Sequence, residues 1–144
     1  MSDYPLFAKL TGRPVLLVGG GHVAERKAEA LLKAGARLQV VAQQLSPQMA
    51  DWQQQGRLEY LGGEFQTEQL AKAFLAVAAT DDAELNRRVF QAAEAAGKFC
   101  NSVDDLDNCS FIVPAVIDRH PLKIAVSSSG STPILARLWR KKIE

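Results

Sequence analysis

A cluster of glycines directly after a short apolar run constrains the fold of this chain of 144 residues more than any other feature. Residues 14–18 read Pro-Val-Leu-Leu-Val, which is typical of a buried β-strand, and a helical pattern begins at Val23. Between them, Gly19, Gly21 and Ala24 take the glycine and alanine positions of a G-x-G-x-x-A turn. Gly19 allows a tight turn, Gly21 lets a ligand approach the backbone, and Ala24 permits close packing of helix on strand.

Such a turn between a strand and a helix predicts a phosphate-binding loop. The helix that follows directs its free N–H groups and the positive end of its dipole at a pyrophosphate. The pattern therefore predicts NAD as cofactor, contacted by Gly19, Gly21, His22 and Val23. Proton transfer by His22 is not expected, because its position faces phosphate and ribose.

Strand-like and helix-like segments alternate along the chain up to residue 103. The predicted strands cover residues 14–18, 37–42, 58–61, 74–79 and 98–103. The predicted helices begin at Val23, after a Ser46 cap, after a Thr67 cap and at residue 82. This alternation favours right-handed crossovers and parallel strands. The predicted fold class is therefore α/β, a Rossmann-type parallel sheet with helices on both faces.

The pattern changes after residue 109. An apolar run interrupted by Pro114, a turn at residues 120–121 and a strand over 122–126 predict a β-hairpin. A serine-rich loop then leads to a helix with Thr132 as its cap and Pro133 at its first position. The apolar side chains of this helix have no obvious partner within the chain.

We therefore predict two parts, an NAD-binding domain over residues 1–113 and a dimerisation element over residues 114–144. The alternative is that the hairpin and helix fold back onto their own domain.

In parallel sheets, ligands bind beyond the carboxyl ends of the strands. This rule selects Thr80, which follows the fourth predicted strand, and Asn101, which lies in the fifth, as cofactor contacts. It also selects Asp104 as a catalytic base that accepts a proton while hydride leaves to the nicotinamide. The alternative for Asp104 is ordinary turn chemistry at a strand end.

The second strand ends at Gln43 and Gln44, where many NAD-binding folds carry an acid that binds the ribose hydroxyls. Either glutamine can form hydrogen bonds with the ribose instead, which specifies the cofactor only weakly. The alternative is that both are solvated loop residues.

Composition excludes several partner classes. The net charge is +1 with scattered basic residues, which does not favour nucleic-acid binding, and no apolar run approaches the length of a membrane span. The N-terminus has no secretion signal, and the two cysteines, Cys100 and Cys109, predict reduced thiols in a cytoplasmic protein. Two isolated cysteines and two separated histidines do not predict a fixed metal site.

Four stretches together carry a family resemblance. They are GRPVLLVGGGHVAERKA at 12–28, AATDDAELNRRVF at 78–90, CNSVDD with SFIVPAVIDR between 100 and 119, and AVSSSGSTPILARLWR at 125–140. In this order they resemble the precorrin-2 dehydrogenase/sirohydrochlorin ferrochelatase domain of siroheme synthase. The resemblance covers essentially the whole chain.

The resemblance implies NAD⁺-dependent oxidation of precorrin-2 to sirohydrochlorin, followed by insertion of Fe²⁺ as substrate to give siroheme. It implies that Asp104 is the catalytic aspartate for both steps, and that a homodimer forms through the segment matching 114–144. The tetrapyrrole carries many carboxylates, so Arg119, Lys123 and Arg137 are candidate anion partners, or else solvated surface residues.

The chain also departs from the family. Ser129 stands where members often carry glycine, and Ser128 matches a position that can be phosphorylated in relatives. Relatives continue past the stretch that matches 114–144, so we expect this chain to be a piece of a longer protein. Two other readings stay open: a non-catalytic NAD(H)-sensing module acting through a dimer, and a ferrochelatase with vestigial NAD⁺.

Overall fold

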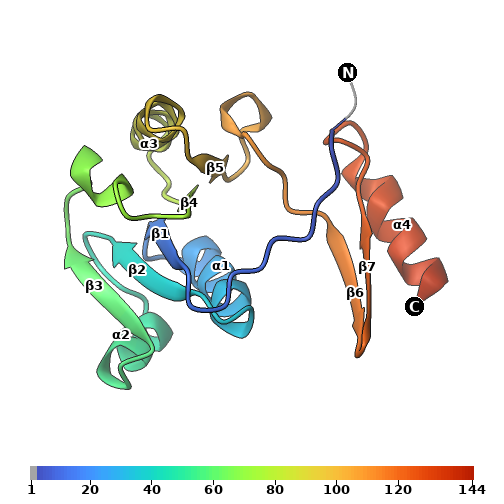
Figure 1. Ribbon diagram of the computed structural model, residues 1–144, viewed down its shortest axis with the longest axis horizontal. Coiled ribbons are helices and arrows are strands. Elements are labelled where there is room, and N and C mark those ends of the chain that lie inside the picture. Colours follow the sequence, from blue (N-terminus) through green and yellow to red (C-terminus); the bar gives the residue numbers. More distant parts are fainter. Residues whose placement is uncertain (1–2) are drawn as a thin grey trace. The chain divides into compact units, whose positions relative to one another are not determined.

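The computed structural model describes residues 3–144, and their contacts divide the chain into two units (Figure 1). The larger unit is Ala8–Phe111. The smaller unit contains Ile112–Glu144 together with the N-terminal segment as far as Phe7. The sequence-based boundary after residue 113 stays a prediction.

The larger unit is built on a sheet of five parallel strands in the order β3-β2-β1-β4-β5. Its strands are β1 (Pro14–Val18), β2 (Arg37–Val41), β3 (Leu58–Gly62), β4 (Leu75–Ala78) and β5 (Phe99–Ser102). Its helices are α1 (His22–Lys33), α2 (Pro47–Gln54) and α3 (Ala83–Ala95), with 3₁₀ turns η1 (Thr67–Leu70) and η2 (Leu106–Asn108). The predicted Rossmann-type α/β class is confirmed.

Helices cover both faces of this sheet, with α1 and α2 on one side and α3 on the other (Figure 1). Alternate residues of β1 supply the two faces. Val15 and Leu17 pack with α1 and α2, while Leu16 and Val18 pack with α3, and all four are almost fully buried. This two-sided burial explains why β1 is a continuous apolar run, and each such side chain contributes about 1.5–3 kcal/mol.

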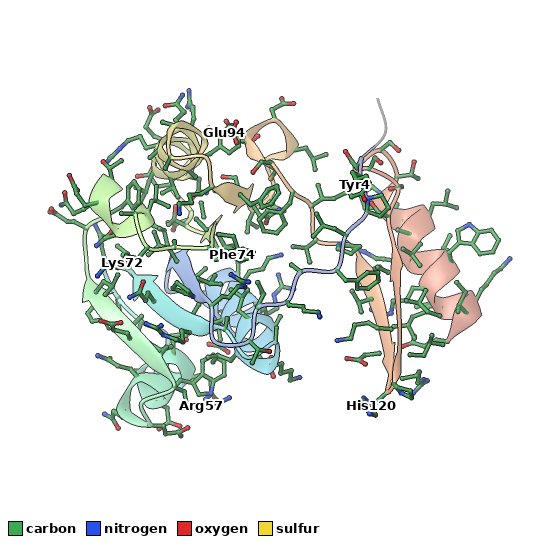
Figure 2. All side chains as sticks on the ribbon, in the orientation of Figure 1. Tyr4, Arg57, Lys72, Phe74, Glu94 and His120 are labelled. Atoms are coloured by element: carbon green, nitrogen blue, oxygen red, sulfur yellow. The ribbon has the colours of Figure 1, made fainter. Side chains whose placement is uncertain are left out.

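The start of β4 is fixed by Phe74, which is labelled in Figure 2. The Phe74 N–H donates to the Pro14 carbonyl at 2.7 Å, and the Arg13 guanidinium lies 4.5 Å from the centre of its ring. As a strand, β4 covers Leu75–Ala78, so it begins one residue later and ends one residue earlier than predicted.

The helix caps agree with the predictions at one position and differ at another. Ser46 caps α2, because its Oγ accepts a hydrogen bond from the Met49 N–H at 3.2 Å. Thr67 does not cap η1 but is its first residue. The Gln69 side chain instead accepts from the Gln66 N–H at 2.8 Å, and η1 ends at Leu70. A 3₁₀ turn held by this long side chain replaces the predicted helix through residue 73.

The smaller unit is an antiparallel hairpin of β6 (Ala115–Arg119) and β7 (Leu122–Val126), followed by α4 (Pro133–Ile143). Ile117 on the hairpin and Ala136 on α4 are its buried apolar side chains. The predicted hairpin and helix are confirmed, but the Thr132 side chain makes no cap. The Ser128 Oγ instead accepts from the Thr132 N–H at 3.0 Å, so the serine loop itself organises the helix start.

No helix in the described part of the chain is long and apolar enough to cross a membrane.

Candidate active site

A cavity of about 630 Å³ opens at the carboxyl edge of the parallel sheet. Its walls are the carboxyl ends of all five strands or the segments that follow them: residues 18–23, 41–44, 63, 65, 79–82, 85 and 103–104. The connections from β1 and β4 leave toward opposite faces of the sheet, and such a switch point is where open α/β sheets bind ligands. Eight of the nine predicted site residues line this one cavity, namely Gly19, Gly21, His22, Val23, Gln43, Gln44, Thr80 and Asp104.

The glycine turn is held closely between its neighbours. Gly19 has φ 136°, and a Cβ placed there would lie 2.4 Å from the Ala79 carbonyl oxygen. Gly20 is equally enclosed, because a Cβ there would lie 2.0 Å from the Gln44 carbonyl oxygen. Position 20 is the variable position between the first two glycines of the G-x-G-x-x-A motif. The requirement for glycine there therefore comes from the tertiary structure alone.

Gly21 differs from its two neighbours, since a Cβ placed there would meet nothing within 4 Å. Gly21 is the N-cap residue of α1, and no side chain among the described residues caps this helix. The N–H groups of its first turn therefore remain available beside the cavity, which His22 and Val23 line. Open space over a glycine at a free helix N-terminus is the arrangement that accepts a phosphate group.

The loop after β2 is tied to the glycine turn. The Ser46 N–H donates to the Gly20 carbonyl at 2.7 Å, and the Ser46 hydroxyl donates to the Glu25 carboxylate at 2.6 Å. These bonds fix the backbone that presents Gln43 and Gln44, whose exposed side chains line the cavity. Both amides can donate as well as accept hydrogen bonds, unlike a carboxylate.

The polar side chains of the loop after β4 form hydrogen bonds within the loop and with the start of α3. The Thr80 hydroxyl donates to Asn86 Oδ1 at 2.6 Å, and the Asn86 amide donates to the Thr80 carbonyl at 3.0 Å. Asp82 caps α3, accepting from the Glu84 and Leu85 N–H groups at 3.1 and 3.2 Å. Thr80 and Asp82 line the cavity, but their side chains are engaged in shaping the loop.

Asp104 is exposed, lines the cavity and adopts a left-handed backbone conformation, with φ 60°. The hydrogen bond from the Asp105 N–H to the Ser102 carbonyl, which closes this turn, is long at 3.3 Å. Aspartate is one of the few residues other than glycine that adopt the left-handed conformation, and it does so at some energetic cost, which neighbouring contacts offset. A strained residue at the edge of a cavity is a candidate functional group.

No sequence signal singled out two residues close to Asp104. Cys109 contacts both ends of the turn through its sulfur. Lys27 lies on α1 one turn beyond Val23, and its pKa is lowered, first by burial and then by Arg26. The Asp104 carboxylate and Cys109 act in the opposite direction and favour the charged ammonium.

The structure does not bring Asn101 into the cavity. Asn101 is 7% exposed, and its side-chain amide donates to the Phe111 carbonyl at 3.0 Å. Arg119, Lys123 and Arg137 belong to the smaller unit, where Lys123 forms an ion pair with Asp118 at 3.2 Å. No group of three or more His, Cys, Asp or Glu side chains suited to a metal ion occurs among residues 3–144.

Cys100 is fully buried on the α3 side of the sheet, and this burial raises the pKa of its thiol to about 12 from 9.0. Above pH 9 the unfolded chain therefore loses a proton that the folded chain retains. We expect this group to make the free energy of unfolding fall by about 1 kcal/mol per pH unit as the pH rises from 9 towards 12.

Urea unfolding at several pH values, compared with Cys100→Ala, measures this effect, because the difference between the two curves isolates the one thiol. Parallel curves for the parent and the variant would contradict it.

A comparison with known families shows which family the chain belongs to. The family model described as "Putative NAD(P)-binding" matches residues 6–115. The chain belongs to this NAD(P)-binding family. A second model, "Sirohaem biosynthesis protein central", matches residues 119–144.

Curated relatives match across the chain. It is 54% identical over 143 residues to siroheme synthase 1 of Serratia proteamaculans, covering 99% of this chain and 30% of that protein. It is 53% identical over 144 residues to siroheme synthase of Neisseria meningitidis serogroup C, again covering 30% of that protein. The chain thus spans less than a third of the length of these relatives.

A solved structure, "SirC, precorrin-2 dehydrogenase", matches 98% of this chain and 69% of its own chain, with a TM-score of 0.84 and 28% identity. The resemblance to a domain of siroheme synthase, inferred from four sequence stretches, is confirmed.

Proposed function

We propose that this chain catalyses the NAD⁺-dependent oxidation of precorrin-2 to sirohydrochlorin. The observation that carries the proposal is that one cavity contains both a dinucleotide-type glycine turn and an exposed carboxylate, Asp104, with no bulky side chain over Gly21. The names of the relatives, siroheme synthase and precorrin-2 dehydrogenase, support this substrate over other tetrapyrroles.

The residues of the cavity fit a dinucleotide. The open space at Gly21 and the free N–H groups of α1 would hold the pyrophosphate, and Gln43 and Gln44 would contact the adenosine ribose. The nicotinamide half would then lie along the 79–82 loop toward Asp104. When bound, NAD⁺ supplies the acceptor for hydride.

Asp104 supplies the second half of the chemistry. Converting precorrin-2 to sirohydrochlorin removes two electrons and two hydrogens, which leave as one hydride and one proton. The Asp104 carboxylate accepts the proton at an Oδ atom, so the products are sirohydrochlorin, NADH and one proton that passes to water. The exposed position of Asp104 allows it to reach the macrocycle and afterwards to release this proton.

A cytoplasmic location stays a prediction. The family resemblance also implies the insertion of Fe²⁺ into sirohydrochlorin, and this further activity stays a prediction too. Stripping pyrrole N–H protons also needs a base, and Asp104 is the candidate for that role.

The direct test is anaerobic incubation of the chain with precorrin-2 and NAD⁺. We expect one molecule of NADH to form for each molecule of sirohydrochlorin. NADH formation is measured by absorbance and fluorescence. Binding of NADH without turnover, together with a ligand-driven change in assembly, would favour the alternative of an NAD(H)-sensing module. Iron insertion without oxidation would favour a ferrochelatase with vestigial NAD⁺.

We also propose that the smaller unit forms a homodimer, as the resemblance implies. Its hairpin and helix expose a set of large apolar side chains: Val116, Leu122, Ile134, Leu135, Leu138, Trp139 and Ile143. Apolar side chains concentrated on so small a unit are typical of an association surface.

Light scattering is expected to give twice the chain mass of 15.7 kDa. Leu138→Glu should raise the dimer dissociation constant by about tenfold or more, because it buries a charge in an apolar contact. Lys141→Glu, also a charge change on α4, serves as the matched control. A parent chain that runs as a monomer at micromolar concentration would contradict the proposal.

A further inference from the structure

The Asp104 turn follows β5, an edge strand of the sheet. The strand next to β5 in the sheet is β4, and the Val103 N–H donates across to the Ala78 carbonyl at 2.9 Å. Because N–H groups alternate in direction along a strand, the Ser102 N–H points away from β4. An edge N–H of this kind needs a partner other than a strand.

The partner is a sulfur atom. The Ser102 N–H donates to Cys109 Sγ at 3.1 Å, and an isolated antiparallel bridge joins Cys109 to Asn101. The same Sγ lies 3.1 Å from the Ser102 carbonyl oxygen and 3.1 Å from the Asp105 carbonyl oxygen. The thiol has one hydrogen, so it donates to one of these two oxygens at a time.

These contacts enclose Asp104 without touching it. Ser102 stands two residues before Asp104 and Asp105 directly after it, and Cys109 bonds to both. The backbone bond that closes the turn is long at 3.3 Å, and Asn108 binds only the Asp105 side of the turn, whereas the sulfur contacts the backbone on both sides of the left-handed residue. Burial raises the pKa of the Cys109 thiol and so preserves the S–H donor that this arrangement needs.

We propose that Cys109 is a positioning residue whose thiol fastens both ends of the Asp104 turn and thereby aims the carboxylate into the cavity. This role rests on the proposed function of Asp104. A hydroxyl offers the same donor and acceptor as a thiol, whereas a methyl group offers neither, so serine and alanine variants separate hydrogen bonding from simple filling of space.

The experiment compares Cys109→Ala and Cys109→Ser with the parent in precorrin-2 oxidation, NADH binding and amide hydrogen exchange. Cys109→Ala is expected to lower kcat by about tenfold or more, because a displaced base loses its alignment with the reacting atoms. NADH affinity should change by less than about twofold, and exchange over residues 102–105 should accelerate about tenfold. Cys109→Ser should restore most of the activity and protection.

Cys100→Ala is the matched control, because it removes the other thiol of the same unit without touching the turn. A Cys109→Ala variant with parental kcat and parental exchange over 102–105 would overturn the proposal. Equal loss in the alanine and serine variants, with faster exchange throughout the larger unit, would also overturn it. Should the parent itself fail to oxidise precorrin-2, the proposed function falls, and the exchange pattern of the two variants still decides the positioning role.

Discussion

Asp104→Asn is expected to lower kcat for precorrin-2 oxidation by about 10²–10⁴-fold while NADH affinity stays within about twofold of the parent. The amide keeps the size of the side chain and, like aspartate, tolerates the left-handed backbone with φ 60°. It removes only the capacity to accept a proton. A selective loss of kcat would therefore assign a chemical role to the carboxylate rather than a role in the turn.

Asp107→Asn is the control for this substitution. Asp107 is exposed in η2, three residues from Asp104, and does not line the cavity. Its variant should turn over like the parent. Stopped-flow measurement of NADH formation gives kcat, and NADH fluorescence titration gives affinity. An Asp104→Asn variant with parental kcat would mean that Asp104 has only a structural role in the turn. It would favour the alternative of a non-catalytic NAD(H)-sensing module.

Gly20→Ala is expected to destabilise the larger unit by about 1–3 kcal/mol or more, through overpacking of the turn. The new Cβ would lie 2.0 Å from the Gln44 carbonyl oxygen and 2.8 Å from the Ala42 Cβ, and neither belongs to a flexible side chain. Relief requires the loop after β2 to move away from the glycine turn. Cofactor affinity should therefore fall together with stability.

Gly21→Ala is the control for Gly20→Ala, because it should leave stability unchanged and lower only the affinity for NADH. Its Cβ meets no atom within 4 Å, so the variant should unfold in urea like the parent. The same Cβ would occupy the space that the pyrophosphate needs, and we expect NADH affinity to fall about tenfold or more. Parental NADH affinity in Gly21→Ala would contradict the assignment of the phosphate site to this turn.

Much of the larger unit could be predicted because its signals are local. A strand buried on both faces is a continuous apolar run, as in residues 15–18, and the serine before Pro47 marks a helix start whatever surrounds it. The positions of Gln43, Thr80 and Asp104 at strand ends then follow from the rule for parallel sheets. These predictions needed no knowledge of contacts distant in sequence.

The remaining features depend on contacts that the local pattern does not contain. The strand-end rule also selected Asn101 as a cofactor contact. The 109–111 segment, however, lies beside β5, and the Asn101 side-chain amide donates its hydrogen bond to the Phe111 carbonyl instead. Cys109 gains its contacts from the same placement. Gly20 must be glycine because of Gln44, 24 positions further along the chain. Each depends on which loops meet at the edge of the sheet.

The most direct test of the central claim is the structure of the chain determined with NAD⁺ bound. We expect the pyrophosphate over Gly21 and the first turn of α1, the adenosine ribose beside Gln43 and Gln44, and the nicotinamide at the Asp104 end of the cavity. A dinucleotide bound elsewhere, or one whose nicotinamide lies at the Gln43 end, would contradict it.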